Sequence, residues 1–204
     1  MPIDLSYTVQ GRGGVAFFWE DNAGHTPWSA LQSYNFDLFP GAQDDWRSVT
    51  SGSFLLSTPF ALAAGQTLTI VADIITAHAF PYYDVGFGLL VSGTQVKAVL
   101  FALRPDGINH RGDLGNVPGT AFPPPSPGVQ VTKVVGGPFK AILGGIQYGK
   151  VNDLSDCSGN CSTLVTSTYL PAAGQYQLLF GMFNVDGSVN DAKPAAIIVQ
   201  FAGN

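Results

Sequence analysis

Hydrophobic and polar residues in this chain fall into short runs that have the length and composition of β-strands. Valine, isoleucine, threonine and aromatic residues are concentrated in these runs, and such residues favour strands. No stretch shows the three-to-four-residue apolar repeat of a long amphipathic helix. The pattern predicts strands over residues 5–9, 15–19, 31–38, 48–56, 67–75, 85–91, 95–103, 129–135, 139–143, 176–183 and 195–201.

The order of polar and apolar positions inside the runs separates two kinds of strand. In residues 51–57 and 66–73 the two kinds of position largely alternate, as they do in a strand with one face in the core and one toward solvent. Residues 85–91 and 195–199 are apolar on both faces. We expect these two runs to be central strands or strands that face a partner.

Turn-forming pairs such as Ala64-Gly65 and Ser92-Gly93 separate the runs. Residues 104–128 are the one long stretch without strand character, and the run Pro123-Pro-Pro-Ser-Pro127 in it favours extended polyproline geometry. The sequence therefore predicts one all-β domain over residues 1–204. We expect a two-sheet antiparallel sandwich, jelly-roll-like, with about ten or eleven strands.

Charge is scarce. Charged residues make up 11% of the chain and hydrophobic residues 46%, whereas an ordinary soluble domain has about 25% charged residues. This composition suggests a surface that is partly covered by other protein; the alternative is a large core in a sparsely charged extracellular protein. A net charge of −5 with nine Lys and Arg argues against binding to nucleic acid or to an anionic membrane.

The two cysteines, Cys157 and Cys161, lie close together around Gly159 and Asn160, which favour a tight turn. We expect a local disulfide, which would stiffen one loop rather than hold the fold together, because the ring it closes is very short. A zinc site would need further Cys or His ligands nearby, and the surrounding sequence has none. A disulfide implies an oxidising compartment, so we expect a secreted or cell-surface protein.

Export signals and membrane spans have sequence patterns of their own. The first residues, Met1-Pro-Ile-Asp-Leu-Ser6, lack the basic and apolar regions of a signal peptide, so we expect either a trimmed signal or another route of export. No run approaches the ~20 apolar residues of a membrane-spanning helix, and membrane insertion is not expected.

Two parts of the chain carry a pattern known from other proteins. One is Ala173-Gly-Gln-Tyr-Gln-Leu-Leu-Phe-Gly-Met-Phe-Asn-Val-Asp-Gly187, followed by the apolar run 195–199; the other joins Ser53-Phe-Leu-Leu, Ala64-Gly-Gln-Thr-Leu-Thr-Ile and Tyr82-Tyr-Asp-Val-Gly-Phe87. Both resemble strands of the exported bacterial β-sandwich domains found in proteins with PEP-CTERM sorting signals. The sorting tail of that family does not occur in this sequence, and Tyr83 stands where the family has Asn. The resemblance implies an exported module of a cell surface or biofilm matrix.

Catalytic motifs are missing from the sequence. It has no nucleophile elbow, zinc-binding His-Glu-x-x-His, phosphate loop or dinucleotide fingerprint. His25, His78 and His110 are scattered and are interpreted as surface or loop residues. Glu20 is the only glutamate, so a glycosidase pair would have to rely on aspartates. We therefore expect no enzymatic activity, with a glycan-active hydrolase as the enzymatic alternative.

Carboxylates give a candidate metal site. Hard cations such as calcium need several oxygen ligands in one place, and the loops of a sandwich can supply them. The candidate calcium ligands are Asp73, Asp84, Asp186 and Asp191. The alternative is that they cap turns by bonding their own backbone.

Aromatic residues give a candidate ligand site. Flat aromatic faces that are exposed on a sheet or its rim can stack on sugar rings. Trp28, Tyr82 and Tyr83 are the candidates because each lies near a proline in a loop-like context, although most aromatic residues of a sandwich belong to its core.

Composition and resemblance together favour a non-enzymatic, extracellular structural or adhesive module of a bacterial surface or matrix. We expect it to self-associate as a homo-oligomer or polymer through charge-poor edges or faces. The alternative is a carbohydrate-binding, lectin-like module, with or without calcium.

Overall fold

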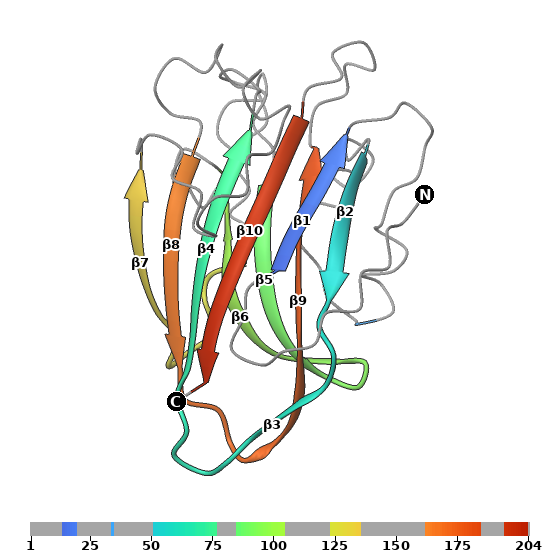
Figure 1. Ribbon diagram of the computed structural model, residues 1–204. Coiled ribbons are helices and arrows are strands. Elements are labelled where there is room, and N and C mark those ends of the chain that lie inside the picture. Colours follow the sequence, from blue (N-terminus) through green and yellow to red (C-terminus); the bar gives the residue numbers. More distant parts are fainter. Residues whose placement is uncertain are drawn as a thin grey trace.

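The computed structural model describes residues 14–19, 34, 51–76, 85–104, 123–135, 162–184 and 194–203, and the structural statements below concern these parts of the chain. They contain ten strands and no helix: β1 (Gly14–Trp19), β2 (Ser51–Leu56), β3 (Phe60–Leu62), β4 (Leu68–Thr76), β5 (Val85–Ser92), β6 (Gln95–Leu103), β7 (Gln130–Val135), β8 (Ser162–Tyr169), β9 (Gly174–Asn184) and β10 (Pro194–Gly203). Figure 1 shows the strands stacked in two layers. No helix within the described ranges is long and apolar enough to cross a membrane.

The strands form two antiparallel sheets. The first sheet has the order β1-β10-β4-β8-β7, and the second has the order β2-β9-β5-β6 with the short β3 also paired to β9. The pairs are nested along the chain: β1 pairs with β10, β2 with β9, β4 with β8, and β5 with β6. This is the pairing of one long hairpin rolled up into two sheets, which defines a jelly roll. The predicted two-sheet, jelly-roll-like sandwich is confirmed.

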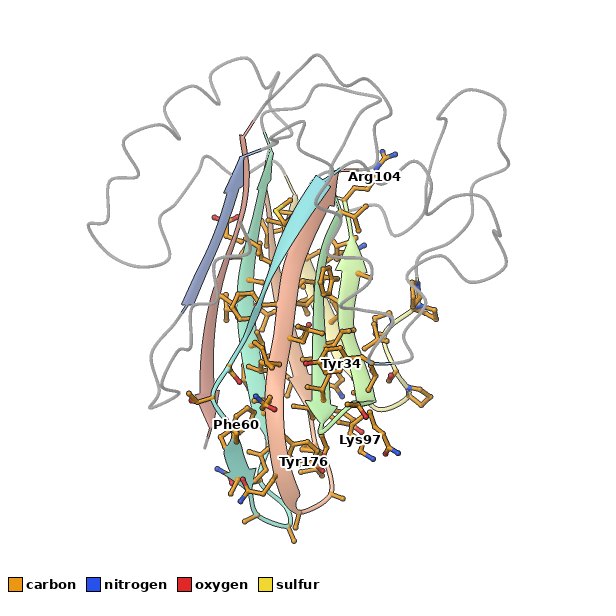
Figure 2. The ribbon with its side chains drawn as sticks, turned by 90° about the vertical axis from the view of Figure 1, so that its right-hand side faces the viewer. Tyr34, Phe60, Lys97, Arg104 and Tyr176 are labelled. Carbon is orange, nitrogen blue, oxygen red and sulfur yellow. The ribbon has the colours of Figure 1, made fainter. Side chains whose placement is uncertain are left out.

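The core lies between the inner faces of the two sheets. Alternate residues of β4 and β9 join one buried cluster, as the period of two in a strand requires. The members of the cluster on these strands are Leu68, Ile70, Ala72, Ile74, Tyr176, Leu178, Phe180 and Met182. Figure 2 shows Phe60 and Tyr176 at one end of the sandwich and Arg104 toward the other. Phe60 and Tyr176 are also partners in the pairing of β3 with β9.

Two inward-facing glycines of β5 make room for large neighbours. A Cβ on Gly86 would come within 2.8 Å of the side chain of Ile74 on the opposite sheet. A Cβ on Gly88 would come within 2.5 Å of the ring of Phe101, its partner on β6. The two side chains occupy the space that the glycines leave, so any larger residue at either position would force them to move.

The β5–β6 pair contains a bulge at Leu100, and Ser167 forms a hydrogen bond with a backbone group of the bulge. The pairing runs from Gly88 with Phe101 to Leu89 with Val99, so Leu100 is the extra residue. Ser167 of β8 is buried and donates its hydroxyl to the carbonyl of Leu100, with an O–O distance of 3.0 Å. This hydrogen bond joins the first sheet to the second inside the core.

Most of the predicted strands agree with the structure, and two strands were missed. The predicted runs 15–19, 48–56, 67–75, 85–91, 95–103, 129–135, 176–183 and 195–201 correspond to β1, β2, β4, β5, β6, β7, β9 and β10. The predicted runs 5–9 and 139–143 lie outside the described residues, and Tyr34, the described residue of the predicted run 31–38, lies in a turn. The sequence did not indicate β3 or β8.

The inner face of β8 explains why that strand was missed. Thr163, Val165 and Ser167 face the core, and all three are buried. Two of these three residues are polar, so the strand lacks the apolar stripe that marks a half-buried strand. The concentration of β-branched residues in Thr163-Leu-Val-Thr166 is the signal that could have revealed it.

Candidate functional site

Among the ionisable residues in the described part of the chain, Asp73 has the most unusual environment. It lies on β4, and its neighbours Ala72 and Ile74 point into the core, so Asp73 points to the outer face of the first sheet. The alternating pattern predicts a solvent-facing position, but the side chain is only 3% exposed. A carboxyl group in this position has lost nearly all of its contact with water.

The cross-strand partners of Asp73 are apolar residues. Its register partners are Leu164 on β8 and Ile198 on β10. Burial raises the pKa of the Asp73 carboxyl to about 7, because desolvation penalises the charged form. The side chain can therefore gain or lose a proton near neutral pH.

Of the four predicted calcium ligands, only Asp73 lies within the described residues. Asp84, Asp186 and Asp191 lie outside the described residues. Within the described ranges no three or more His, Cys, Asp or Glu residues are grouped so that they could hold a metal ion. Calcium binding stays a prediction that rests on the sequence.

The other predicted site residues also lie outside the described ranges. They are the sugar-stacking candidates Trp28, Tyr82 and Tyr83 and the disulfide candidates Cys157 and Cys161. Glycan binding and the disulfide therefore stay predictions as well.

An exposed apolar pair lies beside Asp73 on the outer face of the first sheet. Leu164 pairs with Val134 of the end strand β7, and these side chains are 37% and 59% exposed. Four further outer-face residues of the two strands are uncharged and at least partly exposed: Gln130, Thr132, Thr166 and Thr168. We call these six residues the β7–β8 face.

The whole outer side of the first sheet is almost free of ionisable residues. The register places on it residues 15, 17 and 19 of β1 and the even-numbered residues 194–202 of β10. The register also places on this side the odd-numbered residues 69–75 of β4, the β7–β8 face and Ser162 of β8. Asp73 is the only ionisable residue at these positions. The exposed side chains of the β7–β8 face therefore offer apolar groups and hydroxyl or amide groups, but no charge.

The end strands of both sheets, by contrast, are protected against pairing with another chain. β1 and β2 contact each other on one side of the sandwich. Along β6, the Ser126 N–H donates to the Val99 carbonyl and the Ser126 hydroxyl accepts from the Val99 N–H, with distances of 2.9 and 2.8 Å. The prolines around Ser126 have no N–H to offer a further strand.

The end strand β7 is protected by a charge. Lys133 pairs in register with the core residue Val165, so it occupies an inner-face position, and it is exposed. A charged side chain that points inward on an end strand opposes the addition of another strand, because pairing would bury it. The first sheet can therefore be approached more easily on its face than at its edge.

The sequence indicated neither Leu164 nor Val134 as a functional residue. Leu164 lies on β8, which was not predicted, and the exposure of Val134 depends on the position of β7 at the end of the sheet. The scarcity of charge was the signal in the sequence that pointed toward such a surface. Comparison with protein-family models, with curated proteins and with solved structures found no match for this chain.

Proposed function

We propose that this protein is a non-enzymatic structural or adhesive module of a bacterial surface or extracellular matrix, and that it self-associates through the β7–β8 face. The observation that carries the proposal is the register pair of Val134 and Leu164, which is exposed on a sheet face without charge. Exposed apolar residues grouped in this way are typical of protein interaction sites.

The distribution of charge favours the β7–β8 face as the place where two copies can meet. Each copy has a net charge of −5, so two copies repel each other wherever acidic surfaces approach. The β7–β8 face has no acidic residue and exposes the apolar pair, so two copies can meet there without burying a charge. A two-fold axis would place the same face on both sides of the contact.

The protected edges favour packing of faces over pairing of strands. An added strand would have to displace Ser126 from Val99 on β6 or bury Lys133 on β7. Two sheet faces can instead pack about 10 Å apart with their side chains interdigitated. The sequence left edge and face association open, and the structure of the edges favours the face.

The contact is expected to be weak for a single pair of molecules. Complete burial of a leucine or valine side chain contributes about 1.5–3 kcal/mol, and both residues are already partly buried. The loss of translational and rotational freedom on association opposes this gain. Such a contact becomes effective when many copies are held at high local concentration, as in a surface layer or matrix.

Analytical ultracentrifugation over a range of protein concentrations tests the proposal. We expect the unmodified protein to self-associate and Leu164→Lys to be monomeric, because a lysine would be buried at the contact. Leu170→Lys is the matched control, since Leu170 is 57% exposed and lies after the end of β8. A monomer at every concentration, or equal association of the Leu164→Lys and unmodified proteins, would contradict the proposal.

A further inference from the structure

We propose that the proline-rich segment Pro123-Pro-Pro-Ser-Pro127 is a preformed ligand, and that its outward face binds a partner protein through a groove lined with aromatic side chains. The segment lies at the edge of the second sheet, where Ser126 bonds to Val99 of β6. This site is separate from the β7–β8 face, so the inference goes beyond the proposed function and does not rest on it.

The conformation of the segment follows from its residues. Four of the five are prolines, whose ring fixes φ near about −65°. A residue that precedes a proline is itself restricted to extended backbone, and this applies to Pro123, Pro124 and Ser126. Both restrictions favour a polyproline helix along the segment.

The turn that follows the segment preserves this geometry as far as Pro127. The Val129 N–H donates to the Ser126 carbonyl at 3.0 Å, and Gly128 has a φ of 87°. Proline at the second position and a left-handed glycine at the third are the pattern of a type II turn, in which the proline stays extended. The polyproline helix therefore spans residues 123–127.

Exposure along the segment follows the period of that helix. A polyproline helix has three residues per turn, so residues three apart share a face. Pro123 is buried and Ser126 is half-buried, whereas Pro124 and Pro127 are both exposed. One face is therefore docked on the domain, and the opposite face presents two proline rings to solvent about 9 Å apart, since each residue rises about 3.1 Å.

The domain holds the segment in this conformation. The Ser126 N–H and hydroxyl bond to the Val99 carbonyl and N–H at 2.9 and 2.8 Å. Pro123 is buried at one end, and at the other end a Cβ on Gly128 would lie 3.7 Å from the ring of Tyr169. A partner therefore meets a ligand that is already ordered, and the entropy lost on binding is small.

The chemistry of the exposed face selects the kind of partner. The segment has no charge, and prolines lack the N–H that another strand would need. Proline rings pack well on flat aromatic faces, and a polyproline backbone leaves its carbonyls without internal hydrogen bonds. Trp and Tyr supply both an aromatic face and an N–H or O–H donor. A groove with such residues is the established way in which proteins recognise polyproline segments.

Calorimetric titration of the full chain with an isolated SH3 domain and an isolated WW domain tests the inference, because both domains bind polyproline through aromatic-lined grooves. We expect at least one of them to bind. Pro124→Ala and Pro127→Ala should each weaken this binding about tenfold, since each removes one of the two exposed rings. Pro59→Ala is the matched control, because Pro59 is exposed but lies alone between β2 and β3, and it should leave binding unchanged.

The outcomes separate this site from the β7–β8 face. Failure of both domains to bind the unmodified protein, or equal binding by Pro124→Ala, Pro127→Ala and the unmodified protein, would overturn the inference and leave the proposed function standing. Leu164→Lys should bind the domains as tightly as the unmodified protein, and a loss of binding in this variant would contradict a separate site. Circular dichroism verifies that each variant is folded.

Discussion

The two outer faces of the sandwich differ sharply in exposure. On the second sheet, the outward-facing residues of β5 are Val85, Phe87, Leu89 and Val91, and each is 0% exposed. On the first sheet, Val134 is 59% exposed on the corresponding side. The chain by itself thus buries the outward-facing side of β5 and leaves part of the first sheet's outer side open. A run of large apolar residues marks the first kind of face, and a mixture of threonine with a few aliphatic residues marks the second.

The largest expected effect concerns the buried outer face. Phe87→Ala should reduce the free energy of unfolding by about 3–5 kcal/mol, because it removes a large, fully buried side chain. Leu164→Ala on the open face should cost much less, since Leu164 is partly exposed. Urea unfolding of both variants measures the difference. Equal losses would mean that the two outer faces do not differ in the way their exposure indicates.

The next effect concerns the one ionisable residue on the first sheet's outer side. The pKa of Asp73 is raised to about 7 in the folded state, above its ordinary value of 3.8. The folded state therefore holds a proton that the unfolded state releases. The stabilisation is complete below about pH 4, falls as the pH rises, and is lost above about pH 7; it amounts to roughly 4 kcal/mol.

Urea unfolding at pH 4.5 and pH 7.5 measures this contribution. The free energy of unfolding should fall between these two values in the unmodified protein, and the fall should be much smaller in Asp73→Asn. A fall of the same size in both proteins would show that Asp73 is not the group responsible.

The smallest effect compares the two faces of a single strand. Ser167→Ala leaves the buried carbonyl of Leu100 without its partner and should cost about 1–2 kcal/mol. Thr166→Ala changes the next residue, which points outward and is partly exposed, and should change the free energy of unfolding by less than about 0.5 kcal/mol. Thermal unfolding of the two variants measures both losses of stability. A larger loss for Thr166→Ala would mean that Thr166, and not Ser167, faces the core.

The sequence predicted the architecture more fully than the site. Residues 85–91 are apolar on both faces, which predicted a central strand or a strand that faces a partner, and β5 lies between β9 and β6. β8 contains no glycine and is rich in serine and threonine. It was missed because two of the residues that face the core, Thr163 and Ser167, are polar. Ser167 is needed there by the bulge at Leu100, a partner distant in the sequence that no local pattern reveals.

Asp73 shows the same limit for the candidate site. Alternation along β4 places it on the outer face of the sheet. The sequence offered it as a candidate calcium ligand or as a residue that caps a turn. The structure places it on that face but buried, at 3% exposure. Burial on an outer face depends on how the rest of the chain packs, so the raised pKa could not be inferred from the neighbouring residues.

The nested pairing also has a consequence for the order of events during synthesis. β10 lies between β1 and β4, so the first sheet is continuous only when its last strand is in place. A ribosome that has made β1 must still produce the chain as far as Val199, the partner of Gly14, before that strand is fully paired. The domain is therefore expected to stay incompletely folded until β10 has been made and to complete the sandwich slowly, because contacts between distant residues form late.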